Sequence, residues 1–374
     1  MIYLDNSATT QPLPEAAQAA ARAMTDVWGN PSALHDGGLD ALELLDESRK
    51  AVAKALGCTP AELYFTSGGT AADNTAIFGA ALARRRAGNR VVTTSAEHPA
   101  VARACDRLEA LGCEVTRLPA RADGGFELSA LEEALSDKTI LVSCMAVNNE
   151  LGTITDIPAV SRVVRRCAKN ALFHVDAVQA FGKLPFRADK CGADLVAVSA
   201  HKIHGIKGAG ALYVKKGVRV EPFLVGGGQE RGLVSGTEPM PAIAAFAEAA
   251  KRIGDPAQHL AHARALRSAL TDALADCPHV AINSPADGLP YIVNLSLTGV
   301  PSQPAVNALC EMGVYVSAGS ACKRGHRSEV LTAVHLPPER IDSAIRVSFS
   351  RFNTVEEAYA AAAAIRKTIE RIRR

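Results

Sequence analysis

A lysine and an acid, each placed after an apolar run, are the residues of this sequence that most directly suggest chemistry. Lys202 follows the run 194–198, and Asp176 follows the run 171–175. A pyridoxal phosphate enzyme needs such a pair, because a lysine amine forms a Schiff base with the cofactor aldehyde and an acid keeps a proton on the pyridine nitrogen. The structural alternatives are a helix N-cap for Asp176 and a solvated loop position for Lys202. The glycine-rich segment 205–210 behind Lys202 favours the catalytic interpretation.

A glycine turn lies between an expected strand, residues 63–66, and an expected helix, residues 71–86. Its sequence is Thr-Ser-Gly-Gly-Thr and ends at Gly69 and Thr70. Glycines let the backbone approach an anion, and the N–H groups of a helix N-terminus together with the Thr70 hydroxyl would bind a phosphate. An ordinary turn capped by Thr70 is the other interpretation.

Two further candidates also follow expected strands. His98 precedes a helix expected over residues 100–111, where its imidazole would stack on a cofactor ring and move protons. Asn149 follows another apolar run, and its amide would contact the cofactor or the substrate, or form a turn. A metal site at His201 and His204 is a competing idea, but no third ligand lies at a recognisable spacing, so we expect no metal.

A second distinctive stretch surrounds Cys322, which lies among small residues and is followed by Lys323 and Arg324. An exposed, electropositive setting favours the thiolate, which is the reactive form of cysteine. We therefore expect Cys322 to act as a nucleophile, with a free surface thiol as the alternative. Arg346 lies in an expected apolar strand, residues 345–349, where an unpaired guanidinium would be costly. It suits a substrate carboxylate, which it would bind with two parallel hydrogen bonds.

Short β-branched runs alternate with amphipathic stretches in the first part of the chain. We expect strands at residues 63–66, 90–94, 114–118, 140–144, 171–175, 194–198 and 211–214. Strands that are apolar on both faces and alternate with helices indicate an α/β fold with a mainly parallel sheet, covered by helices on both faces. Ligands of such sheets bind beyond the carboxyl ends of the strands, where most of the candidate residues lie.

The pattern changes after residue 255, where longer helices surround a few strands. We expect helices at residues 257–274, 303–311 and 355–373 and strands at 291–297 and 345–349, which indicates a smaller α+β domain. A chain of 374 residues exceeds the size at which single cores stop growing. We therefore predict a large cofactor-binding domain at residues 15–252. The small domain would consist of residues 1–14 and 253–374 and would carry the Cys322 loop.

Composition excludes several classes of function. The formal net charge of +2 gives no reason to expect a nucleic acid or an anionic membrane as a partner, and no run reaches the roughly 20 apolar residues of a membrane span. The nine cysteines contain no C-x-x-C pair, and the N-terminus shows no signal-peptide pattern. A reducing cytoplasm is the expected location.

Taken in order, these motifs resemble the class V, fold-type I pyridoxal phosphate enzymes, and within them the NifS/IscS-like cysteine desulfurases. The resemblance runs almost end to end. It rests on residues 3–10, 29–32, 65–70, 97–98, 147–152, 174–179, 201–202, 226–232, 235–237 and 319–322.

The resemblance implies a role for each residue around the cofactor. Lys202 would hold it and move the Cα proton, and Asp176 would pair with the pyridine nitrogen. Gln179 would contact the ring oxygen, and His98 would stack over the ring. The residues expected at the phosphate are Gly69, Thr70, Ser199, His201 and, from the partner subunit of a homodimer, Thr237.

The resemblance also implies the reaction. Asn149, which would touch the cofactor as well, and Arg346 would hold the substrate, L-cysteine. Cys322 would attack the sulfur of the cysteine–cofactor adduct, keep it as a persulfide and release alanine. An acceptor protein for iron–sulfur cluster assembly or tRNA thiolation would then take the sulfur.

Other functions remain open at this stage. A selenocysteine lyase or a class V aminotransferase would share the cofactor site, and the aminotransferase would not need the Cys322 thiol. A partner-binding module without catalysis would show no spectral change on addition of L-cysteine.

Overall fold

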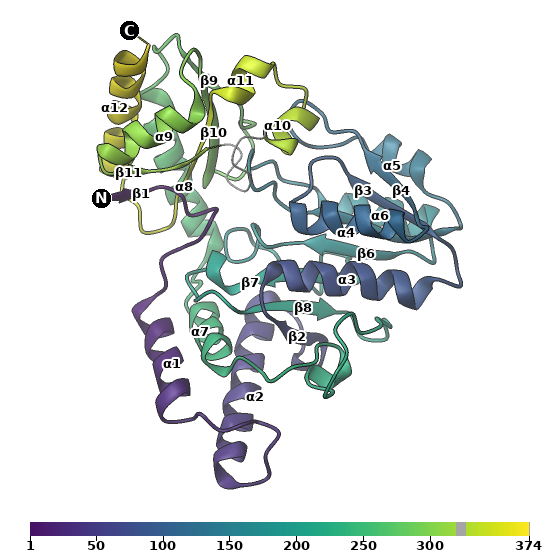
Figure 1. Ribbon diagram of the computed structural model, residues 1–374. Coiled ribbons are helices and arrows are strands. Elements are labelled where there is room, and N and C mark those ends of the chain that lie inside the picture. The colour runs from purple at the N-terminus through teal and green to yellow at the C-terminus, as the bar shows by residue number, and fades with distance from the viewer. Residues whose placement is uncertain (319–326, 374) are drawn as a thin grey trace.

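The computed structural model describes residues 1–318 and 327–373, and its largest element is a seven-stranded sheet (Figure 1). The strand order is β2-β8-β7-β6-β5-β3-β4. Neighbours from β7 to β4 pair in parallel, whereas β8 is antiparallel to both β7 and β2. The strands are β2 (Leu63–Thr66), β3 (Arg90–Thr94), β4 (Glu114–Leu118), β5 (Thr139–Met145), β6 (Leu172–Asp176), β7 (Leu195–Ser199) and β8 (Gly210–Val214). Each strand expected in this region is therefore confirmed, with its ends shifted by at most one residue.

Helices cover both faces of this sheet. Alternate side chains of the strands enter two separate apolar clusters: Val91 and Leu141 lie in one, and Val92 and Val142 lie in the other. The first cluster is completed by α3 (Gly69–Arg84) and α4 (Pro99–Ala110). The second is completed by α2 (Asp36–Leu56), α5 (Leu128–Ala134), α6 (Ile157–Cys167) and α7 (Met240–Lys251). Burial on both sides explains why these strands are almost continuously apolar, and the expected α/β fold is confirmed.

A smaller antiparallel sheet lies beside the large one and has the order β12-β13-β10-β9. Its strands are β9 (Val280–Ile282), β10 (Ile292–Leu297), β12 (Ser317–Ala318) and β13 (Ala344–Ser348). Its helices are α8 (Pro256–Asp272), α9 (Ser302–Glu311), α10 (Glu329–Ala333), α11 (Pro338–Asp342) and α12 (Val355–Ile372). The three helices and two strands expected in this region are confirmed to within two residues.

The N-terminal segment connects the two sheets. The strand β1 (Ile2–Tyr3) pairs with β11 (Val314–Tyr315), and the chain then runs past β13 to α1 (Pro14–Thr25), which packs on α7 (Figure 1). One apolar cluster contains Leu4, Phe65 of the large sheet and Ile292 of the small sheet, so the core is continuous between the sheets. Segment 4–13 is thereby held across the carboxyl-terminal edge of the large sheet.

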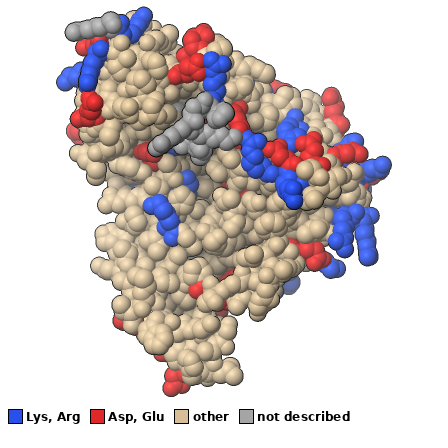
Figure 2. Space-filling view, viewed as in Figure 1, with Lys and Arg blue, Asp and Glu red and all other residues tan. Residues whose placement is uncertain are grey.

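Charged side chains of both signs lie side by side on the face drawn in Figure 2, over α4 and α5. On α4, Asp106 forms ion pairs with Arg103 and with Arg117 of β4. Among the described residues, no helix combines the length and the apolar character that a membrane span requires.

Candidate active site

A cavity of about 360 Å³ lies beyond the carboxyl ends of the large sheet's strands, facing the small sheet. The predicted site residues that line it are Gly69, Thr70, His98, Asn149, Asp176, Gln179, Ser199, His201, Lys202 and Arg346. Thr237 is exposed and does not line the cavity. Cys322 lies outside the described residues. The structure thus brings together ten residues that are far apart in the sequence.

The strands explain how these side chains meet. Asp176 and Ser199 are the last residues of β6 and β7, and Lys202 ends the single 3-10 turn that follows β7. His98 follows β3 and is the N-cap of α4. Since the carboxyl ends of parallel strands share one edge of a sheet, residues just after different strands converge there.

The turn between β2 and α3 is built for close approach to an anion. Gly68 has a φ of 150°, a conformation that favours glycine, and a Cβ on Gly69 would lie 2.8 Å from Val178 Cγ2. The backbone N–H groups at the start of α3 therefore remain accessible next to the Thr70 hydroxyl. Ser199 Oγ is buried here and has no hydrogen-bond partner among the described residues. A phosphate group would satisfy these donors.

Lys202 and Asp176 lie in the same cavity, as the sequence predicts. Lys202 Nζ donates to the backbone carbonyls of Ser7 and Ala8, with a distance of 2.9 Å to the Ala8 oxygen. Asp176 is 6% exposed, and its Oδ1 accepts from the Val178 N–H at 2.9 Å. Burial raises the pKa of Asp176, and the charges of His98 and Lys202 oppose that rise. A buried acid facing a lysine amine fits the pyridine nitrogen and aldehyde of pyridoxal phosphate.

His98 has a fixed tautomer in its neutral form. Its Nδ1 accepts from the Ala100 N–H at 3.1 Å, so a neutral ring carries its proton on Nε2. Burial lowers the pKa of His98, and the Lys202 and Arg346 cations add to that effect against the attraction of Asp176. The lowered pKa favours the neutral imidazole, which is the form that can accept a proton.

Arg346 reaches the cavity from β13 of the small sheet. It donates to the Asn149 carbonyl oxygen at 2.9 Å and to Asp5 Oδ1 at 3.0 Å. Arg346 Nε and Asn149 Oδ1 are buried and have no partner among the described residues. This pair of groups suits the carboxylate and amine of an amino acid, which together need a cationic donor and an acceptor.

Several residues of the site were not predicted. Asp73 lines the cavity from α3, is 1% exposed, and its Oδ1 lies 3.4 Å from His174 Nε2. Asp73 follows Gly69 by four residues, so the helical period could have placed it on the same face. The sequence could not indicate the contacts of the Ser7 and Ala8 carbonyls, because every residue has a backbone carbonyl whatever its side chain.

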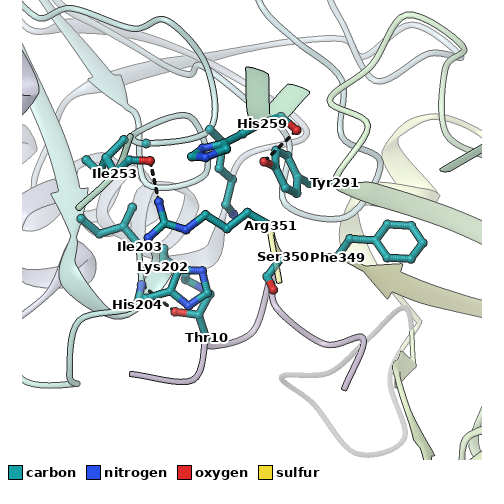
Figure 3. A pocket seen from close by; sticks show the side chains of 12 residues that line it. Thr10, Lys202, Ile203, His204, Ile253, His259, Tyr291, Phe349, Ser350 and Arg351 are labelled. Carbon is teal, nitrogen blue, oxygen red and sulfur yellow. Dashed lines mark hydrogen bonds between the residues drawn. The ribbon is translucent and has the colours of Figure 1, made fainter. Parts of the chain in front are cut away.

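A second cavity lies on the other side of Lys202, where the two sheets meet (Figure 3). Its volume is about 30 Å³, enough for a water molecule but not for a cofactor. Arg351 crosses it and donates to the Ile253 carbonyl oxygen, and His204 lies beside Thr10 (Figure 3). The larger cavity is therefore the candidate active site.

The described cysteines differ from the setting expected for a nucleophile. Burial raises the pKa of five of them, to about 12 for Cys58 and Cys105. The other three are Cys167, Cys277 and the exposed Cys310, and none of the eight lines the cavity.

Comparison with known proteins agrees with this geometry. The family model for aminotransferase class V matches residues 2–360. A NifS/IcsS protein homolog of Lactobacillus delbrueckii subsp. bulgaricus is 43% identical over 96% of this chain and 94% of its own length. The cysteine desulfurase IscS of Serratia proteamaculans is 41% identical over 100% of this chain and 93% of its own length. A solved NifS-like protein superposes with a TM-score of 0.92 at 34% identity, covering 99% of this chain and 98% of that one.

Fold, cavity and family model thus define a class V aminotransferase-type enzyme. Within that family, the chain belongs to the NifS/IscS group of cysteine desulfurases.

Proposed function

We propose that this protein removes sulfur from L-cysteine with the help of pyridoxal phosphate, releases L-alanine and keeps the sulfur as a persulfide on Cys322. The single observation that carries the proposal is the placement of Lys202, Asp176 and His98 around one cavity that Arg346 enters from the opposite side. Family membership supports the same activity.

Different residues of the cavity would bind the phosphate, the pyridine ring and the substrate. The turn at Gly69 and Thr70, with Ser199 and His201, would hold the phosphate, and Asp176 would hold the pyridine nitrogen. When bound, pyridoxal phosphate supplies an aldehyde for the Lys202 amine and a protonated ring that accepts the electron pair of a broken bond. Arg346 and Asn149 would orient the substrate, so that its Cα proton faces Lys202.

Cys322 would take the sulfur. Its thiolate attacks the substrate sulfur, an S–S bond forms, the Cβ–S bond breaks and its electrons go to carbon, which takes up a proton to give alanine. The persulfide would pass to an acceptor protein of iron–sulfur cluster assembly or tRNA thiolation. All eight described cysteines are unpaired thiols, which suits a reducing compartment such as the cytoplasm.

A homodimer is part of this proposal. The phosphate turn also borders an open hollow of about 540 Å³ that Lys207 and Phe223 line. Large apolar side chains on the surface, such as Trp28 and Leu34 at 77% and 95% exposed, favour a covered interface. The partner subunit's Thr237 would complete the phosphate site there. We further propose that the domain boundaries lie at residues 14/15 and 252/253, since α1 packs on α7, whose residues enter the core of the large sheet.

The decisive experiment is mass spectrometry after brief exposure of the loaded protein to L-cysteine, with alanine assayed in parallel. We expect the peptide that contains Cys322 to gain one sulfur atom, a mass increase of about 32 Da. Cys322→Ser should abolish sulfur transfer and leave the visible spectrum of the loaded protein intact. Cys310→Ser, which removes an exposed thiol elsewhere in the chain, is the matched control and should transfer sulfur normally.

The same experiment separates the alternatives. An aminotransferase would keep its activity in Cys322→Ser. A binding module would form no alanine. Protein that stayed colourless with pyridoxal phosphate, with nothing trapped on Lys202 by borohydride, would refute the proposed function.

A further inference from the structure

We propose that Lys183 is a positioning residue, which holds the carboxamide of Gln179 so that its NH2 group faces the cofactor cavity. The inference rests on the proposed function, because it assigns to Gln179 a hydrogen-bond donor role toward the ring oxygen of pyridoxal phosphate.

The local backbone brings the two side chains together. Residues 177–184 form a helical turn after β6, in which the Phe181 N–H donates to the Ala177 carbonyl oxygen at 2.8 Å. Side chains four residues apart lie on the same side of such a turn. Lys183 Nζ accordingly donates to Gln179 Oε1 at 2.7 Å.

The orientation of the carboxamide follows from its two partners. Gln179 Nε2 donates to the Ser7 carbonyl oxygen at 3.0 Å, and a carbonyl oxygen can only accept. Oε1 must then point the other way, where Lys183 meets it. The NH2 group has a second hydrogen, and Gln179 lines the cavity. That hydrogen is the one available to an oxygen of a bound ring.

Lys183 is an unusual residue to find here, since it is 8% exposed. A lysine so deeply buried is costly unless its ammonium group serves a partner. Among the described residues, Gln179 is the partner that accepts a hydrogen bond from Lys183 Nζ, and it is not an acid. Burial lowers the pKa of Lys183 to about 7, and the Lys202 and Arg346 cations add to the effect. His201 and His204 are the other titratable groups that feel its charge.

The ring oxygen explains what the arrangement would achieve. A hydrogen-bond donor aimed at this oxygen stabilises the oxygen's negative charge. The oxygen then attracts the proton on the neighbouring Lys202 nitrogen less strongly. Without Lys183, Oε1 loses its partner and only the Ser7 carbonyl still fixes the carboxamide, so the donor is held less firmly toward the ring oxygen. The proton on the Lys202 nitrogen should then be held more tightly.

The test is a pH titration of the visible absorbance of the loaded enzyme, which requires no turnover. We expect Lys183→Met and Gln179→Leu each to raise the midpoint by about one pH unit, a tenfold change in proton affinity. In the double variant the shift should equal that of the larger single variant, because both changes remove the same donor. Lys183→Arg, which keeps a donor at this position, should lie close to wild type.

The outcomes separate this inference from the function on which it rests. Additive shifts would mean that Lys183 acts by charge alone, and an unshifted midpoint in Lys183→Met would mean that it is structural; both overturn the inference and leave the function intact. Wild-type protein without a visible band would refute the function itself. Lys190→Met, a change at an exposed lysine of the same segment, is the control and should not move the midpoint. Where Lys183→Met does not fold, Lys183→Gln replaces it, since its shorter side chain leaves the donor out of reach.

Discussion

The two sides of the cavity are built in different ways. One side, here called the strand-end side, consists of residues at or just after the ends of strands of the large sheet: Gly69, Thr70, His98, Asn149, Asp176, Ser199 and Lys202. The other, the small-sheet side, is formed by the N-terminal segment and the small sheet: Ser7 and Arg346 line the cavity, and Asp5 and Ser317 hold Arg346 from behind through hydrogen bonds. The strand-end side carries the groups that would hold the cofactor, together with Asn149, and the small-sheet side carries Arg346, the cation that would hold the substrate carboxylate.

The contacts that fix the two sides differ in range. Each residue of the strand-end side is placed by a strand that ends at it or a few positions before it. On the small-sheet side, Asp5 binds Arg346 and Ser317, which are 341 and 312 residues away along the chain. The Ser7 N–H donates to Ser348 Oγ at 2.8 Å over a similar separation. Substrate binding therefore depends on how the chain termini meet, whereas cofactor binding depends on the large sheet.

The largest expected effect comes from the strand-end side. Asp176→Asn removes the acid that would keep the pyridine nitrogen protonated, so we expect kcat to fall by roughly 10²–10⁴-fold, the range that acid–base groups contribute. The KM for L-cysteine should change little, because Arg346 and Asn149 are untouched. Steady-state alanine formation measures both.

Asp189→Asn is the control for that substitution. Asp189 is an exposed acid that pairs with Arg187, and its loss should leave kcat unchanged. A large rise in KM for Asp176→Asn, with kcat preserved, would show that the division of roles between the two sides is wrong.

A smaller effect is expected on the small-sheet side. Asp5 Oδ1 accepts from Arg346 at 3.0 Å and from Ser317 Oγ at 2.8 Å, so Asp5 holds the guanidinium in position. Hydrogen bonds to charged groups contribute about 1.5–3 kcal/mol, so Asp5→Asn should raise KM about tenfold while kcat stays within about twofold. The visible spectrum of the loaded protein should not change.

A change of KM in the opposite direction would contradict this role of Asp5. A lower KM would mean that Asp5 masks the charge of Arg346 rather than orienting it. Asp276→Asn removes an acid that pairs with Arg366 on the surface, and it should leave KM as it is.

The difference in sequence separation between these contacts also explains how much of the site the sequence could predict. Asp176 and His98 follow apolar runs whose β-branched composition marks the strands, so local pattern sufficed to find them, whereas Ser199 was indicated only by the family resemblance. Arg346 was found because a charge in an apolar strand is conspicuous. The contact of Asp5 with Arg346, and the Ser7 carbonyl that meets Lys202, depend on pairing between distant segments, and no sequence window contains that information. The element boundaries moved by one or two residues because helix and strand ends are set by caps and neighbours.

The last expected effect concerns the stability of the strand-end side rather than its kinetics. Glu97 is buried beneath His98, where its Oε1 accepts from Thr94 Oγ1 at 2.6 Å and from the Met145 N–H at 3.1 Å. Burial is the main cause that raises the pKa of Glu97, from 4.5 to about 8. Between these values the folded chain keeps a proton that the unfolded chain has lost, so stability falls as pH rises. From pH 5.5 to 7 this group alone should lower the free energy of unfolding by about 2 kcal/mol.

Glu97→Gln cannot ionise, so its free energy of unfolding should fall less steeply over the same pH range than that of wild type. Urea denaturation of both proteins without cofactor, at half-unit pH steps, measures the difference. Glu133→Gln, a change at an exposed acid, should follow the wild-type curve. Parallel curves of unfolding free energy against pH for Glu97→Gln and wild type would show that water reaches Glu97 more than its burial indicates. The acids on the two sides of the cavity would then no longer differ in their access to water, since the Asp5 side chain is 22% accessible.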